Sequence, residues 1–120
     1  MNTSPTVRTG LAHEQRALDY LTQQGLDLVE RNFRCKLGEI DLIMRDDDVT
    51  VFVEVRYRRS SSHGGALASI GQAKAQRIAA TAQIWLRKTR ATPDRPIRFD
   101  VVALEGPQPT LRWLKAAFEF

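Results

Sequence analysis

Two apolar segments, Gly38–Met44 and Val49–Arg56, follow one another with only a short run of aspartates between them. Alternating apolar segments on either side of a polar turn predict an antiparallel β-hairpin. A two-residue loop at Asp47 and Asp48 sets the register, so that Asp46 pairs with Val49. This hairpin is the element around which we expect the rest of the chain to fold.

The register gathers charged residues on the hairpin. Asp41 falls opposite Glu54, and Glu39 falls opposite Arg56. Alternation places Glu39, Asp41 and Ile43 on one face of the first strand. Directly opposed residues have Cβ atoms about 4.5–5.5 Å apart, and two carboxylates that close repel unless a positive charge lies between them. The hydrophobic effect gives no reason for this arrangement, so the hairpin is a candidate functional site.

Length and composition limit what the chain can be. Its 120 residues suit one domain, and its net charge of +4 favours a polyanionic partner without identifying it. The single cysteine, Cys35, excludes an internal disulfide and a cysteine-rich zinc site. Neither a membrane-length apolar run nor the apolar core of a signal peptide is visible, so we expect a cytoplasmic protein with no membrane partner.

Residues 9–24 predict a first helix, which Gly25 ends. Residues 1–8 are expected to be a disordered lead, and residues 9–120 the single domain. Glu14 falls on the apolar stripe of this helix. The other members of the stripe are Leu11, Leu18 and Leu21. A carboxylate there has two structural explanations, a place at the margin of the stripe or a pair with an arginine. The third explanation is a functional site.

The order of the remaining elements predicts the fold class. We expect a strand over Leu26–Cys35, the hairpin, a helix from Ser69 or Gln72 to Lys88, a strand over Ile97–Leu104, a short edge strand over Thr110–Leu114 and a docked tail to Phe120. The crossover helix makes the Ile97–Leu104 strand parallel to the one bearing Glu54. The prediction is an α/β domain: a helix, three antiparallel strands, a helix and a parallel strand, forming a mixed sheet flanked by helices.

An acid, a hairpin, and then an acid and a basic residue separated by one residue resemble the PD-(D/E)xK motif of restriction-endonuclease-like nucleases. More closely, the chain resembles the YraN-like family, small bacterial proteins predicted to be endonucleases. The resemblance implies a restriction-endonuclease-like core. It is carried by Gly10–Leu21, Arg31–Arg34, Gly38–Ile43, Val51–Arg58, Lys74 and Arg98–Val102.

The resemblance implies a role for each matching residue. Asp41 matches the metal-binding aspartate, and Glu54 matches the acid of the second half-motif. Glu14 matches a helical glutamate of the branch that resembles Holliday-junction resolvases, which would direct it at the metal. With a backbone carbonyl such as that of Val55, these oxygens suit Mg²⁺ or Mn²⁺. The alternative is that Asp41 and Glu54 are exposed acids on a solvated sheet face.

Phosphodiester hydrolysis adds negative charge to an anionic centre, and a divalent ion neutralises that charge and lowers the pKa of bound water. Arg56 occupies the position of the motif lysine. It stays protonated and cannot act as a base, but it can clamp the scissile phosphate. Lys74 or Lys36 could replace the missing lysine, and Lys74 is favoured because it begins a helix near the strand ends. The structural interpretation of Arg56 is a cross-strand salt bridge with Glu39, and the two roles are compatible.

Basic residues follow the hairpin and continue into the second helix. They form either a surface that tracks nucleic-acid phosphates or a solvated basic face. Tyr57 and Trp85 are expected in the core, and His63 is expected to have no role. The proposed phosphate-binding residues are Lys36, Arg56, Arg58, Arg59, Lys74 and Arg77.

Three functions remain open. The first is a metal-dependent endonuclease that hydrolyses DNA, either generally or in a structure-specific manner, with Asp41, Glu54, Arg56 and Lys74 as catalytic residues. The second is a nucleic-acid-binding module on a nuclease scaffold that catalyses nothing. The third is a protein whose basic face binds an acidic partner. Cutting both strands of a symmetric junction would favour a homodimer.

Overall fold

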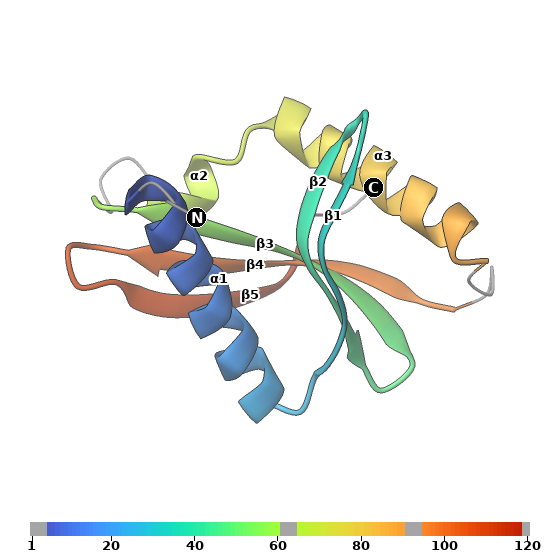
Figure 1. Ribbon diagram of the computed structural model, residues 1–120, viewed down its shortest axis with the longest axis horizontal. Helices are drawn as coiled ribbons and strands as arrows, with labels where there is room; N and C mark the ends of the chain where they lie inside the picture. Colours follow the sequence, from blue (N-terminus) through green and yellow to red (C-terminus); the bar gives the residue numbers. More distant parts are fainter. Residues whose placement is uncertain (1–4, 61–64, 91–94, 119–120) are drawn as a thin grey trace.

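The computed structural model describes residues 5–60, 65–90 and 95–118. They form a five-stranded sheet in the order β1-β2-β3-β4-β5, with helices on both faces (Figure 1). The elements are α1 (Pro5–Gln23), β1 (Asp27–Cys35), β2 (Gly38–Asp46), β3 (Val49–Arg58), α2 (Gly65–Ala68), α3 (Gln72–Lys88), β4 (Ile97–Glu105) and β5 (Thr110–Phe118). Only β3 and β4 pair in parallel, as predicted. The mixed α/β architecture is confirmed and is consistent with a restriction-endonuclease-like fold.

The two ends of the chain are more regular than predicted. Helix α1 begins at Pro5 rather than at Thr9, because proline's fixed φ and missing N–H suit the first turn of a helix. Residues 1–4 of the expected lead lie outside the described residues. At the other end, β5 continues through Phe118 along β4, so most of the expected tail is strand. Residues 119–120 also lie outside the described part.

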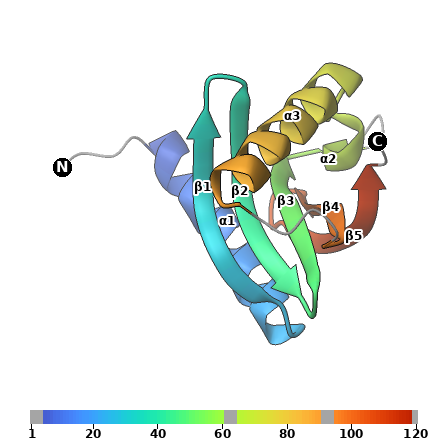
Figure 2. The same ribbon diagram turned by 90° about the vertical axis from the view of Figure 1, so that its right-hand side faces the viewer.

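The sheet has a hydrophobic core on each face, and Figure 2 shows α3 and α1 on opposite sides of it. Residues of α1, Ala17, Leu18 and Leu21, pack against strand residues that include Leu42, Met44, Val51 and Val53. Residues of α3, Ile78, Ala82 and Trp85, pack against Phe33, Ile43, Phe52 and Phe99. Each fully buried Leu, Ile, Val, Met or Phe side chain contributes about 1.5–3 kcal/mol, so both helices are held firmly on the sheet.

The hairpin has the predicted register, but its two strands separate before its end. Pairing runs from Asp46 and Val49 to Leu42 and Val53, and no pair beyond these is formed between the described residues of β2 and β3. From that point the β1–β2 hairpin turns away from β3, as Figure 1 shows. The result is a fork in the sheet at Asp41, the position where the candidate site was expected.

Simple alternation along β2 fails at the same place. Ile40 and Ile43 are three residues apart, yet both pack in the core beneath α3. Opposite this stretch, Asn32 of β1 has a positive φ of 52°. The predicted shared face of Glu39, Asp41 and Ile43 is therefore wrong, because the strand twists between the core and its outer end.

A candidate metal centre at the fork between β2 and β3

Asp41 and Glu54 come from the two arms of the fork. Asp41 lies one residue beyond the last paired residue of β2, and its Oδ2 accepts a 2.8 Å hydrogen bond from the backbone N–H of Val55. Glu54, the preceding residue of β3, is buried, with only 6% of its surface exposed. The alternative of two exposed acids on a solvated face is therefore wrong for this pair. The fork brings the two carboxylates close enough to repel one another, with Glu54 buried and Asp41 half-buried.

This environment disfavours the ionised form of both carboxylates. Burial, followed by the negative charge of Glu54, raises the pKa of Asp41 to about 8. Burial also raises the pKa of Glu54, although the neighbouring cations Lys74 and Arg56 oppose the shift. A buried pair of this kind takes up either a proton or a cation, since both relieve the repulsion. The pair therefore has the electrostatic character of a cation site.

The available donors suit a hard cation. Within the described residues, the hydrogen bond from Val55 is the only one that the Asp41 carboxylate accepts, and it leaves Oδ1 without a partner. In an extended strand the N–H and C=O of one residue point to the same edge, so the carbonyl of Val55 also faces the fork. Two carboxylates and a carbonyl are oxygen ligands of the type that Mg²⁺ takes.

Glu14 approaches the pair from α1. It is half-buried, and its Oε1 is buried without a hydrogen-bond partner in the described structure. Burial and then the charge of Glu39 raise its pKa, while Arg31 and the side chain of Asn32 lower it. Its charge in turn raises the pKa of Asp41. Glu14 is thus influenced by the charges of Arg31 and Arg34 and itself acts on Asp41, and its role at a functional site stays a prediction.

Glu14 does not complete a three-carboxylate cluster. Among the residues that the structure describes, no group of three or more His, Cys, Asp or Glu side chains is close enough to hold one metal ion. The predicted ligand set of Asp41, Glu54, Glu14 and Val55 is thus brought together only around the first two acids and the Val55 backbone. Glu14 adds negative potential from nearby.

Of the two candidate lysines, the structure brings Lys74 to the acids. Lys74 lies in the first turn of α3, and its Nζ is 3.3 Å from Oε1 of Glu54. Lys36 is exposed in the turn between β1 and β2. Of the two lysines, only Lys74 therefore lies within ion-pair distance of an acid of the described site.

Arg56 does not pair with Glu39, so that expectation is wrong. The guanidinium Nε of Arg56 donates a 2.8 Å hydrogen bond to Oγ of Ser69, between α2 and α3. Glu39 instead forms an exposed ion pair with Arg34, at 3.5 Å. The reason is the fork, since β2 carries Glu39 away from β3 beyond the last paired residues.

The other basic residues lie farther out. Arg58 and Arg59, at the end of β3, are exposed. Arg77 is exposed on α3, beside Gly38 at the start of β2. The glycine and serine loop that connects these regions, including His63, lies partly outside the described residues. Arg56 and Lys74 thus flank the acids, while Arg58, Arg59, Arg77 and Lys36 lie on the surface around them.

Of the two aromatic residues expected in the core, Trp85 lies there, whereas Tyr57 is half-buried outside it. Trp85 is buried and packs edge-on against Phe52, with ring centroids 5.8 Å apart. Tyr57 is half-buried and stacks on His13 of α1 at 4.4 Å. This stacking holds the first half of α1, and therefore Glu14, against β3.

Two residues with a functional or structural role were not among the sequence-predicted site residues. Ser69 binds Arg56, but a serine in a polar loop carries no signal for such a contact. Asp100, in the middle of β4, is fully buried and accepts hydrogen bonds from Arg98, Trp113 and the backbone of Ala116. An acid in the middle of an apolar strand is a signal that could have identified Asp100 as buried and paired.

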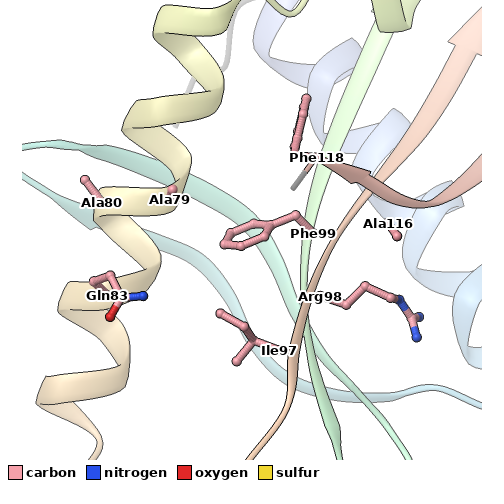
Figure 3. Close-up of a pocket in the computed structure, with 8 residues that line it drawn as sticks. All are labelled: Ala79, Ala80, Gln83, Ile97, Arg98, Phe99, Ala116 and Phe118. Carbon is pink, nitrogen blue, oxygen red and sulfur yellow. The ribbon is translucent and has the colours of Figure 1, made fainter. Parts of the chain in front are cut away.

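A cavity of about 690 Å³ lies away from the fork, between α3 and the strands β4 and β5. Figure 3 shows its walls, in which Arg98 and Gln83 are the polar members and no acid takes part. Arg98 pairs with Asp46 and Asp100, outside the cavity. This cavity lacks the groups that phosphodiester chemistry needs. The remaining lining residues are Ala79, Ala80, Ile97, Phe99, Ala116 and Phe118.

Comparison with known proteins agrees with the resemblance seen in the sequence. The family described as "Uncharacterised protein family UPF0102" matches residues 13–104, a span that includes both acids, Arg56 and Lys74. A UPF0102 protein of Alkalilimnicola ehrlichii is 54% identical over 115 residues, which cover 96% of this chain and 90% of that protein. A UPF0102 protein of Pseudomonas putida is 52% identical over 119 residues, covering 97% and 96%.

More distant relatives match over the same length. A UPF0102 protein of Pseudomonas syringae is 44% identical over 122 residues, which cover 99% of both chains. In the described part of this chain, no helix is both long and apolar enough to cross a membrane. The family match over most of the chain and these full-length relatives lead to one conclusion: the chain belongs to the UPF0102 family of YraN-like proteins.

Proposed function

We propose that the protein is a metal-dependent endonuclease that hydrolyses phosphodiester bonds in DNA. The observation that carries the proposal is the pair of carboxylates at the fork, with Glu54 buried, Asp41 half-buried and both pKa values raised. A fold requires no such pair for stability, because neutral or apolar residues would fill the space without repulsion. The electrostatic cost of holding these two carboxylates together is explained if the pair binds a divalent cation.

Asp41, Glu54 and the Val55 carbonyl would hold the ion. When bound, Mg²⁺ or Mn²⁺ would supply charge neutralisation at the phosphate and would lower the pKa of a bound water. The hydrogen bond from Val55 keeps the Asp41 carboxylate in a single orientation, which a metal site needs. Glu14 adds negative potential at the same end of the sheet and so strengthens the attraction for the cation.

Lys74 and Arg56 supply positive charge on the other side of the acids. Lys74 lies 3.3 Å from Glu54, where its ammonium group can donate a hydrogen bond to an approaching phosphate oxygen. It takes the place of the motif lysine that Arg56 has replaced. Arg56 holds the phosphate rather than moving a proton, because its guanidinium stays protonated. Such fixed donors stabilise the charge that develops in the transition state.

One assay tests the enzymatic proposal. The purified protein and Asp41→Asn are incubated with linear, supercoiled, flap and four-way DNA in Mg²⁺ or Mn²⁺. We expect metal-dependent cleavage by the wild-type protein only, and the preferred DNA identifies the substrate class. Equal cleavage by both proteins would come from a contaminant and would refute the proposal.

The same assay separates the main alternative. Arg56 in place of lysine is the observation that favours a non-catalytic nucleic-acid-binding module. That module would bind DNA in a salt-sensitive manner, and binding would survive Asp41→Asn with no cleavage in any metal. The third possibility, a basic face that binds an acidic protein, is separated from this module by competition with heparin or DNA. The homodimer remains a prediction, and sedimentation of the DNA complex tests it.

A further inference from the structure

We propose that Ser69 is the positioning residue of an anion subsite in which Arg56 presents the Nη1–Nη2 edge of its guanidinium to a phosphate group. This inference rests on the proposed function only in that the anion is taken to be a nucleic-acid phosphate. The subsite itself concerns binding and needs no cleavage. It is carried by a chain of hydrogen bonds that runs from β4, through α2, to Arg56.

The first link orients the guanidinium. Nε of Arg56 donates a 2.8 Å hydrogen bond to Oγ of Ser69, and that hydroxyl donates a 2.6 Å hydrogen bond to the carbonyl of Ala66. The hydroxyl proton is therefore committed to Ala66, and the oxygen lone pairs face Arg56. Because a guanidinium is planar and rigid, fixing Nε fixes the direction of the whole group.

The remaining edge of Arg56 is left for a ligand. In the described structure, neither Nη1 nor Nη2 has a hydrogen-bond or ion-pair partner. Arg56 is half-buried, two residues after Glu54 on the same strand. Two parallel N–H donors on the rigid guanidinium plane match two oxygens of a phosphate, a geometry that a flexible lysine cannot offer. The Arg56 side chain thus places a bidentate phosphate donor beside the acid pair.

The second link holds Ser69 in place. Oε2 of Glu105, at the end of β4, accepts a 3.2 Å hydrogen bond from the backbone N–H of Ala66. Oε1 of Glu105 accepts a 3.0 Å hydrogen bond from Arg112 of β5. Gly65 has a φ of +67°, and a Cβ there would overlap the Glu105 carboxylate. The short helix α2 is therefore docked on the sheet in one position, which sets the position of Ser69.

A double-mutant cycle tests the subsite. The Kd of a fluorescein-labelled 20-base-pair duplex is measured by anisotropy for the wild-type protein, Ser69→Ala, Arg56→Gln and the double mutant, in Ca²⁺ and between 50 and 200 mM salt. We expect Arg56→Gln to weaken binding and to lower the salt slope by about 0.9, the value for one phosphate contact. Ser69→Ala should weaken binding about 2- to 10-fold, as the loss of one hydrogen bond would.

The proposal requires that the effects of the Ser69 and Arg56 substitutions on Kd are coupled. With Arg56→Gln already present, Ser69→Ala should change Kd less than twofold, and Ser69→Thr, which keeps a hydroxyl, should bind as the wild-type protein does. Thr89→Ala is the matched control, since Thr89 also donates a hydroxyl hydrogen bond to a helix carbonyl but far from the fork. The Nε–H signal of Arg56 in a ¹⁵N spectrum should lose its protection from exchange in Ser69→Ala only.

The outcomes separate this inference from the endonuclease proposal. Coupling between Ser69 and Arg56 without cleavage in any metal would support the subsite and refute the enzyme. Metal-dependent cleavage with equal losses from Ser69→Ala in both backgrounds, or with no loss, would support the enzyme and overturn the subsite. Absence of salt-dependent binding by the wild-type protein would also overturn the subsite.

Discussion

The backbone N–H of Val55 donates a 2.8 Å hydrogen bond to the carboxylate of Asp41, at the point where β2 leaves β3. A side chain here accepts a bond that a strand carbonyl would accept in a continuous ladder. The bond lets the strands separate without leaving a buried N–H unpaired. It also directs the carboxylate toward Glu54, so the fork and the acid pair have one structural cause.

Metal binding should stabilise the protein through this pair. At about ten times its Kd, Mn²⁺ should add about 1.4 kcal/mol to the free energy of unfolding, which raises Tm by about 5 °C. Asp41→Asn and Glu54→Gln should abolish this shift, since each removes a ligand charge. Differential scanning fluorimetry measures it, with the exposed Asp48→Asn as a control that keeps the shift. A full shift in Asp41→Asn would remove Asp41 from the site.

The metal-free protein should lose stability as pH rises toward 8. The folded-state pKa of Asp41 is raised from 3.8 to about 8, so the folded state holds a proton that the unfolded state has released. The stabilisation from this proton is full below about pH 4 and is lost as pH rises through about 8. Thermal unfolding in EDTA from pH 5 to 9 checks this.

Asp41→Asn is the control for the pH series. An amide does not titrate, so the contribution of this residue to the decline should vanish and the variant should be more stable than wild type at pH 8. Added Mn²⁺ should stabilise the wild-type protein more at pH 8 than at pH 6, because the ion must displace the proton. Identical pH profiles for the two proteins would contradict the raised pKa of Asp41 in the folded state.

The two candidate lysines should behave differently. Lys74→Met removes the cation 3.3 Å from Glu54 and should lower kcat by about 10²-fold or more, a typical loss for one donor to the transition state. Lys36→Met, in an exposed turn, should leave kcat unchanged and only weaken DNA binding at higher salt. Single-turnover cleavage measures both. Equal effects of the two variants would show that Lys74 acts only through net charge.

Asp100 should matter for stability alone. Asp100→Asn replaces an acceptor of four hydrogen bonds by an amide, whose N–H₂ would face the donors of Arg98 or Trp113. Disrupting a buried ion pair of this kind costs about 3–5 kcal/mol. Urea unfolding measures the loss, and the folded variant should retain its affinity for Mn²⁺. A loss below about 1 kcal/mol would show that the network contributes little.

Much of the site could be predicted because it depends on local rules. The two-residue turn at Asp47 and Asp48 sets a register that extends to Leu42 and Val53. Asp41 and Glu54 are the next residues beyond this last pair. The crossover helix required β4 to be parallel to β3, and it is. Hairpin pairing and helix periodicity act over a few residues, so the order of residues along the chain is enough to predict them.

By itself, the sequence determined the order of the elements, the hairpin register and the two acids that face one another. Only the tertiary structure decided that β2 turns away at Asp41, that Arg56 binds Ser69 instead of Glu39, and that Lys74 is the lysine at the site. These contacts join residues from separate elements, whose positions depend on the twist of the whole sheet and on how both helices pack. Neither is encoded in any short stretch of sequence, because each results from the packing of the complete core.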